Sequence, residues 1–218
     1  GSSIAYIGIM ESLLSAGVAR FYCKYKNENN LERMENVLAI SQRIYGVFSL
    51  FVCVCGIILI FVFKIIYSSS LSRLEMRESV IMLILFIINI IINIMNYVYV
   101  AAITGSEKFI FLKIISIFSM ILQPMIVYLL IQKHPYAVMI VIAIVLINLV
   151  VAIVRRTYAK EKLRTKIKYH GKDNEFIKGL FQLSASILLA LLADQIFWKT
   201  DQLIIGKILN TSAVAVYA

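Results

Sequence analysis

Residues 79–103 read SVIMLILFIINIIINIMNYVYVAAI, a stretch without a single charged side chain. Few helices of a water-soluble domain are apolar for so long, whereas about 20 consecutive apolar residues cross the hydrocarbon core of a bilayer. The stretch shows no period-two alternation, and an open sheet could not satisfy its backbone hydrogen bonds in lipid. It therefore predicts a transmembrane helix and sets the fold class of the chain.

The composition of the whole chain agrees with this interpretation. Of its 218 residues, 61% are hydrophobic and 16% are charged, and the mean hydropathy is +0.88. Soluble domains contain roughly 45–50% apolar and about 25% charged residues. The composition excludes a cytosolic enzyme, a secreted disulfide scaffold and a disordered regulator. We expect the basic residues that give the net charge of +10 to contact anionic membrane lipids and not nucleic acid.

Other apolar runs predict the remaining helices. Together they indicate an all-α, polytopic transmembrane helix bundle with about six complete spans and the start of a seventh at Ser212. Pro124 should kink the fourth helix, because it lacks a backbone N–H. The chain begins at Gly1 without methionine and ends as an apolar stretch opens, so we expect a piece of a longer protein. The runs cover residues 4–21, 44–63, 79–103, 109–132, 136–154 and 177–208.

The basic residues predict the orientation of these spans. Five lie between Arg20 and Arg43 and nine between Arg155 and Lys178, out of 22 in the chain. Four spans separate the two segments, so both should lie on one side, which the positive-inside rule makes the cytoplasm. The basic loops fit contact with lipid headgroups, and a role in holding a phosphorylated partner is the alternative.

The sixth run carries a polar face. At 100° per residue, its charged and amide side chains and Trp198 occupy one half of the helix, and apolar residues occupy the other. A helix with one polar half is typical of a cavity wall. Anchoring of the helix at the outer membrane interface is the alternative, because the polar residues lie toward its outer end. The polar residues are Asp194, Gln195, Lys199, Asp201 and Gln202.

Other polar groups lie within the first and third runs. Glu11 and Arg20 flank a series of small residues that permits close helix packing. Asn89, Asn93 and Asn96 recur at i, i+4 and i+7, which favours interhelical hydrogen bonding over lining of a path. The sequence contains no nucleophile–base pair, metal-ligand cluster or glycine-rich phosphate loop, so we expect neither an enzyme nor a cofactor.

Three stretches resemble the O-antigen and polysaccharide flippases of the multidrug/oligosaccharidyl-lipid/polysaccharide exporter superfamily. Residues 193–206, followed by 211–217, are similar to the seventh span and the start of the eighth. Residues 12–21 are similar to the second span where it runs into the first cytoplasmic loop, and residues 105–109 to the turn between spans four and five. The resemblance assigns 1–159 to most of an N-terminal lobe, 160–175 to a basic cytoplasmic inter-lobe loop and 176–218 to the start of a C-terminal lobe.

The resemblance implies a transporter in the bacterial cytoplasmic membrane. Such proteins flip an isoprenoid-diphosphate-linked oligosaccharide, for example an O-antigen unit of lipopolysaccharide, by alternating access, in some cases with a coupling proton or sodium ion and polysaccharide assembly proteins as partners. A cation-coupled multidrug exporter, a membrane-embedded polymerase or ligase and a purely structural subunit are the alternatives. The implied path residues are Asp194, Lys199, Asp201, Gln195, Gln202, Glu11 and Arg20.

Overall fold

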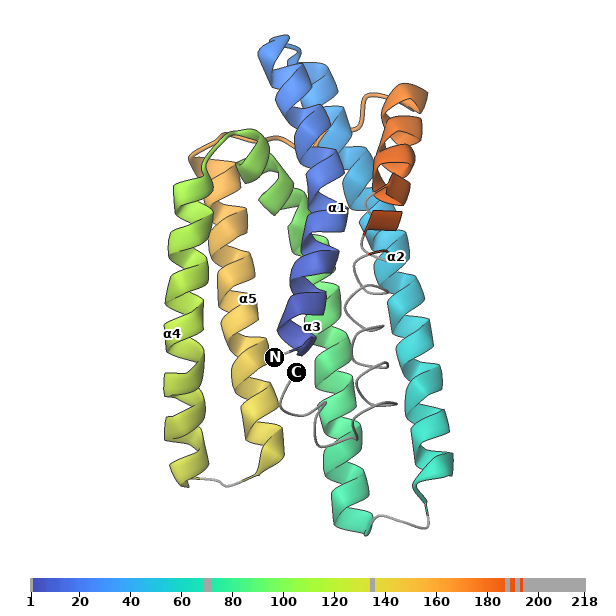
Figure 1. Ribbon diagram of the computed structural model, residues 1–218, viewed down its shortest axis with the longest axis vertical. Helices are drawn as coiled ribbons and strands as arrows, with labels where there is room; N and C mark the ends of the chain where they lie inside the picture. Colours follow the sequence, from blue (N-terminus) through green and yellow to red (C-terminus); the bar gives the residue numbers. More distant parts are fainter. Residues whose placement is uncertain (1, 69–71, 134–135, 187–188, 191–192, 194–218) are drawn as a thin grey trace, which may run out of the picture. The chain divides into compact units, whose positions relative to one another are not determined.

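The structure is a computed structural model that describes residues 2–68, 72–133, 136–186, 189–190 and 193, with backbone alone at 2–14, 131 and 133 (Figure 1). Within these residues the chain is helical and contains no strand, which confirms the all-α prediction. The chain divides into two compact units. One is Val18–Asp173, and the other comprises the described residues of Gly1–Gly17 and Asn174–Ala218.

Six helices are present in the described part of the chain, five of them with defined bounds. The sixth covers residues 174–186, and the prediction of a span to 208 extends beyond the described residues. Four helices, α2 to α5, are long and apolar enough to cross a membrane, fewer than the six complete spans predicted. The helices are α1 (Ser2–Asn27), α2 (Leu31–Ile66), α3 (Arg73–Gly105), α4 (Phe109–Lys133) and α5 (Ala137–Glu161).

The helices extend beyond the apolar runs, so the loop boundaries predicted from hydropathy were wrong. The largest difference is at α2, where residues 31–43 are helical although the sequence placed them in a basic loop. The Asn30 side chain accepts a hydrogen bond from the Arg33 N–H at 3.0 Å and caps this extension. At 36 residues α2 is about 54 Å long, well beyond a hydrocarbon core of about 30 Å, so part of it lies in water.

The four long helices of the Val18–Asp173 unit pack in the spatial order α2, α3, α5, α4 (Figure 1). The side chain of Ile87 on α3 packs against the backbone of α2 at Gly56, where an added Cβ would lie 2.5 Å from Cδ1 of Ile87. The α4 and α5 helices meet through the stacked rings of Phe111 and Tyr158, whose centroids are 3.5 Å apart. Neighbouring helices are therefore fixed by contacts between residues far apart in sequence.

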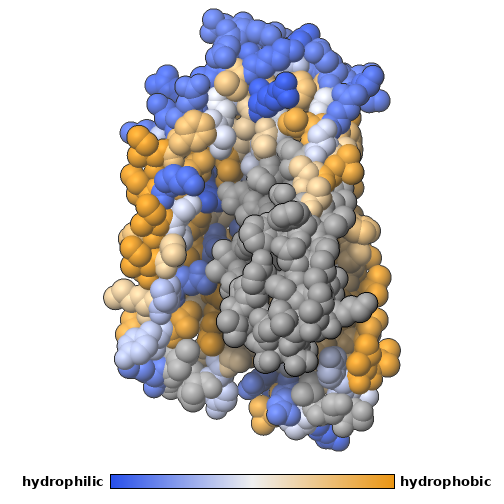
Figure 2. Space-filling model, viewed as in Figure 1, coloured by the Kyte–Doolittle hydropathy of each residue, from blue (hydrophilic) through white to orange (hydrophobic). Residues whose placement is uncertain are grey.

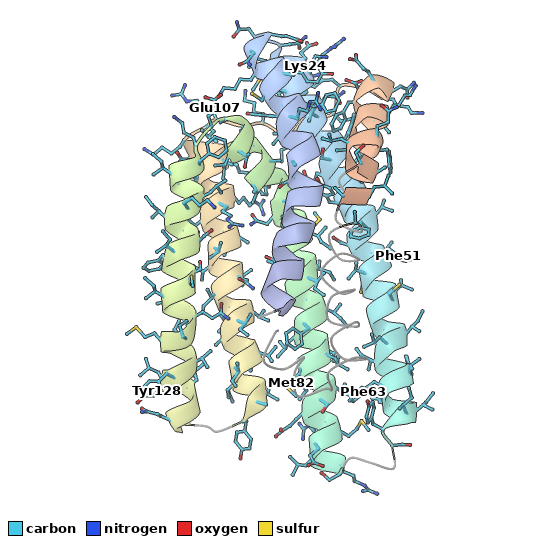
Figure 3. All side chains as sticks on the ribbon, viewed as in Figure 1. Lys24, Phe51, Phe63, Met82, Glu107 and Tyr128 are labelled. Atoms are coloured by element: carbon cyan, nitrogen blue, oxygen red, sulfur yellow. The ribbon has the colours of Figure 1, made fainter. Side chains whose placement is uncertain are left out.

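The connections of this unit alternate between its two ends. The turns at 28–30 and 106–108 and the linker at 162–173 lie at one end (Figure 1). The count of spans predicted this for the two basic segments, which contain the first turn and the linker. Lys24 and Glu107 mark this end, whereas Phe63 and Tyr128 lie toward the other (Figure 3). Hydrophilic residues gather over the end that holds these turns (Figure 2). We call it the charged end.

Apolar side chains cover the outward faces of the long helices between the two ends (Figure 2). Ile65 of α2 and Met120 of α4 are 74% and 78% exposed. Contiguous apolar surface of this extent is not tolerated in water, so these faces contact lipid. The α4 helix continues through Pro124, and the predicted kink there stays a prediction.

The second unit shows the close packing that the small residues of the first run predicted. A Cβ added to Gly17 of α1 would lie 2.6 Å from Cδ1 of Leu180, in the helix that begins at residue 174. Only glycine leaves room for this leucine without a shift. The small-residue series is thus confirmed as a packing surface at Gly17.

Candidate functional site

Most residues of the predicted transport path lie outside the described part of the chain. This holds for Asp194 and Lys199 and for the other three polar residues of the sixth run, Gln195, Asp201 and Gln202. Glu11 lies on α1, where the structure describes the backbone alone. Arg20 lies on the same helix and its side chain is exposed. The assignment of these seven residues to one path therefore stays a prediction.

The asparagines of the third run do join two helices. Nδ2 of Asn148 on α5 donates a hydrogen bond to Oδ1 of Asn89 on α3 at 2.8 Å, which confirms the interhelical role predicted for Asn89. Asn93 instead donates to the backbone oxygen of Asn89 in its own helix, at 3.0 Å. Asn96 is buried, and its Oδ1 accepts no hydrogen bond from the described residues. Asn148 was missed, although a lone amide in an apolar run was a readable signal.

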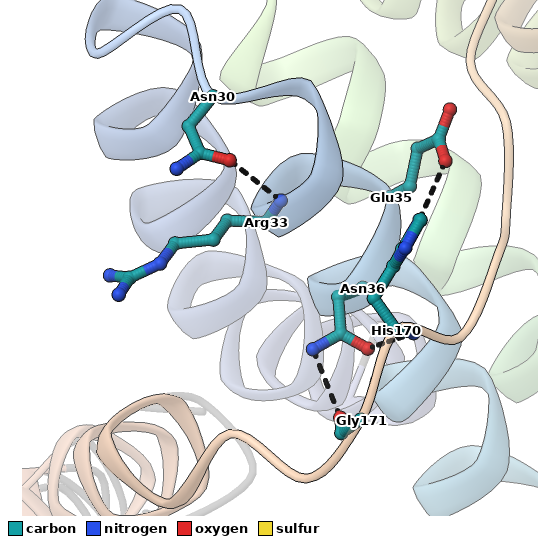
Figure 4. Close-up of polar contacts among 6 residues, drawn as sticks. All are labelled: Asn30, Arg33, Glu35, Asn36, His170 and Gly171. Carbon is teal, nitrogen blue, oxygen red and sulfur yellow. Dashed lines mark hydrogen bonds and ion pairs between the residues drawn. The ribbon is translucent and has the colours of Figure 1, made fainter.

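The linker at 162–173 is held against α2 by one buried side chain. Oδ1 of Asn36 accepts a hydrogen bond from the backbone N–H of His170 at 2.9 Å, and its Nδ2 donates to the backbone oxygen of Gly171 at 3.0 Å (Figure 4). Both polar groups of this amide are used. Nε2 of His170 also lies 2.9 Å from a carboxylate oxygen of the neighbouring Glu35 (Figure 4).

Two further contacts fix the linker on either side of this anchor. The guanidinium carbon of Arg43 lies 3.8 Å from the ring centroid of Tyr169, within the range of a cation–π interaction. Nearer α5, the Thr165 hydroxyl donates to the backbone oxygen of Ala159 at 2.6 Å, and the Thr165 N–H donates to the same oxygen at 3.1 Å. The part of the linker between α5 and Gly171 is thus a defined structural element.

A basic cavity of about 490 Å³ opens between this linker and helices α2, α3 and α5. Arg156 and Lys160 of α5 and Lys166 of the linker supply three positive charges, and no carboxylate occurs among the described residues of the lining. The arginine also lies over the Tyr99 ring, with its guanidinium carbon 5.9 Å from the centroid. The described residues of the lining are Gln42, Tyr99, Arg156, Lys160, Thr165, Lys166 and Ile167.

Two of the lining residues, Tyr99 and Ile167, belong to an apolar cluster next to this cavity. Tyr99 and Ile103 of α3 and Ala159 of α5 form a buried cluster, and Ile167 of the linker packs against it. Three cations beside the side chains of Tyr99 and Ile167 favour an anion that carries an apolar part. No group of three or more metal-ligating side chains occurs among the described residues. The sequence showed the excess of basic residues here but gave no sign that the linker folds back beside α5, where Arg156, Lys160 and Lys166 remain exposed.

The four lipid-facing helices define a multi-pass membrane protein. Over residues 2–218 the sequence matches the family described as "Polysaccharide biosynthesis protein", and the chain belongs to this family. No curated protein matches the chain significantly.

Among solved structures, the chain is similar to a MOP superfamily transporter from Pyrococcus furiosus Vc1 (DSM3638), with a TM-score of 0.75 and 14% sequence identity. The match covers 98% of this chain and 48% of the transporter, so the chain spans about half the length of that structure. At this identity the likeness shows a shared fold.

Proposed function

We propose that the protein to which this chain belongs flips an isoprenoid-diphosphate-linked oligosaccharide across the bacterial cytoplasmic membrane by alternating access. The proposal rests on the match of residues 2–218 to a polysaccharide biosynthesis family. The fold of the chain, which is similar to that of a transporter, supports it. A polysaccharide pathway needs its lipid-linked intermediates moved across a bilayer, and α2 to α5 are built to lie in one. The chain spans about half of the similar transporter, so a complete path requires helices beyond it.

The polar residues of the first and sixth runs are our candidates for the path. Lys199 and Arg20 would attract the diphosphate or an acidic sugar, because a cation in a site of low dielectric binds phosphate oxygens strongly. The carboxylates of Asp194, Asp201 and Glu11 would accept hydrogen bonds from sugar hydroxyls or bind a coupling proton or sodium ion. Gln195 and Gln202 would add amide hydrogen bonds to the sugar.

Single substitutions in the full-length protein test this assignment. Lys199→Ala and Asp201→Ala should each abolish surface glycan assembly at normal expression in the membrane, with glycan measured on the cell surface. Lys172→Ala, which removes an exposed lysine of the linker, serves as the control and should leave glycan unchanged. Normal glycan in both Lys199→Ala and Asp201→Ala cells would contradict the site assignment.

A further inference from the structure

We propose that the basic cavity between α5 and the linker binds the phosphate-bearing headgroup of an anionic membrane lipid. The lining of this site shares no residue with our assignment of the transport path, and the inference does not depend on the transported substrate. Its ligand chemistry is a phosphate monoanion or dianion attached to acyl chains.

The charge of the cavity selects an anion. Arg156 and Lys160 are four residues apart on α5, so they project from the same face of the helix, and Lys166 approaches from the linker. An arginine offers paired N–H donors to two phosphate oxygens, and each lysine adds a point charge. Because the described lining residues include no carboxylate to neutralise them, the three cations create a positive field that attracts a phosphate.

The outer surface of α5 provides a place for acyl chains. Leu149 and Ile153 are 40% and 55% exposed, and they precede Arg156 and Lys160 on the same face, all four within about 60° around the helix axis. Ile153 lies about 4.5 Å below Arg156 along the axis. This apolar stripe would contact the acyl chains of a phospholipid, and the two cations at its end would bind the charged headgroup.

The linker makes this site preformed. Lys166 and Ile167 lie in the segment between two fixed points, the Thr165 hydrogen bonds to Ala159 and the Asn36 hydrogen bonds to residues 170 and 171. Ile167 also packs on the apolar cluster of Tyr99 and Ala159. A preformed cavity binds with less loss of conformational entropy than a mobile basic loop. The preformed cavity therefore distinguishes a specific lipid site from the general attraction between basic loops and anionic lipid.

Lipid binding to the purified full-length protein tests the proposal. Native mass spectrometry would measure retention of phosphatidylglycerol and of phosphatidylcholine with identical acyl chains. Wild-type protein should retain phosphatidylglycerol preferentially, and the Arg156→Gln/Lys160→Gln variant should bind it about 25-fold more weakly, at about a factor of five for each basic side chain. The control variant Lys26→Gln/Lys172→Gln removes two exposed charges outside the cavity lining and should retain wild-type affinity.

The charge-conserving variant Arg156→Lys/Lys160→Arg separates binding from folding. It should keep most of the affinity for phosphatidylglycerol, and all variants should show the unfolding temperature of the wild type. An equal loss in the control variant, or equal retention of the two lipids by the wild type, would overturn the proposal. Inorganic diphosphate serves as the soluble probe. Its binding to the cavity without retention of phosphatidylglycerol would overturn the assignment to a lipid.

Discussion

The amide of Asn148 on α5 donates a hydrogen bond to the amide oxygen of Asn89 on α3, across 2.8 Å. Asn89 is buried, and apolar residues precede and follow both positions in sequence. In such surroundings neither amide finds water as an alternative partner, so the bond specifies which faces of the two helices meet. The register of the α3–α5 pair therefore depends on two residues that are 59 positions apart.

A double-mutant cycle on this pair should show coupling. Asn89→Ala and Asn148→Ala, singly and together, should give an interaction free energy of about 0.6 kcal/mol and at most about 1.7 kcal/mol, the range for hydrogen bonds between membrane helices. The free energy of unfolding in mixed micelles is the measurement. Asn93→Ala is the control, because Asn93 bonds within its own helix, and it should not couple to Asn148→Ala. Additive effects of Asn89→Ala and Asn148→Ala would contradict the bond.

Glycine at position 105 is required by the packing of α1 on the end of α3. A Cβ there would lie 2.8 Å from the backbone oxygen of Ala19, and a backbone atom cannot move aside as a side chain can. Gly105→Ala should therefore destabilise the protein by about 1–3 kcal/mol, measured as the free energy of unfolding.

Gly46→Ala is the matched control for that substitution. Among the described residues, no atom outside the glycine's own stretch of helix lies within 4 Å of a Cβ built at this position. The substitution should be neutral or should stabilise the protein by up to about 1 kcal/mol, because alanine has the higher helix propensity. A similar loss of stability in both variants would show that close packing is not the cause.

Asn36 should control the order of the linker. Asn36→Ala removes the partners of the His170 N–H and the Gly171 carbonyl while leaving α2 helical. The amide of residue 170 should then exchange its hydrogen faster, which hydrogen–deuterium exchange measures on peptides covering 165–171. Asn27→Ala, at a residue without a bond to the linker, should leave the exchange unchanged. Unaltered protection in Asn36→Ala would contradict the anchor.

The start of α3 is stabilised by a capping box. The Ser72 hydroxyl accepts a hydrogen bond from the Glu75 N–H at 3.3 Å, and the Glu75 carboxylate accepts one from the Ser72 N–H at 2.9 Å. Ser72→Ala should cost about 1 kcal/mol of unfolding free energy and increase hydrogen exchange at residues 73–76. Ser79→Ala, within the same helix, should change neither, and equal effects of the two would argue against the cap.

The sequence predicted the helical class, the four long apolar helices and the end at which their connections lie. These features follow from hydropathy and from counting spans, both of which are local properties of the chain. Helix ends were predicted less well. An apolar run stops at the edge of the hydrocarbon core, whereas a helix can continue beyond that edge into water. Asn30 before α2 and the Ser72–Glu75 pair before α3 were readable capping signals at two of these ends.

The basic cavity and its anchor could not be predicted in this way. Asn36 and His170 are 134 residues apart, and neither stands out in composition or periodicity. Their contact depends on the tertiary course of the linker. The amide of Asn148 is an intermediate case, since its place in an apolar run marked it as a hydrogen-bonding residue without naming its partner.

Transport of a labelled isoprenoid-diphosphate-linked oligosaccharide into proteoliposomes tests the central proposal most directly. The full-length protein should move the label from the outer to the inner leaflet, as scored by protection from an external glycan-cleaving enzyme. Lys199→Ala protein reconstituted at equal density should not. Protection that is no greater with the full-length protein than in protein-free vesicles would contradict the assignment of this family member as a flippase.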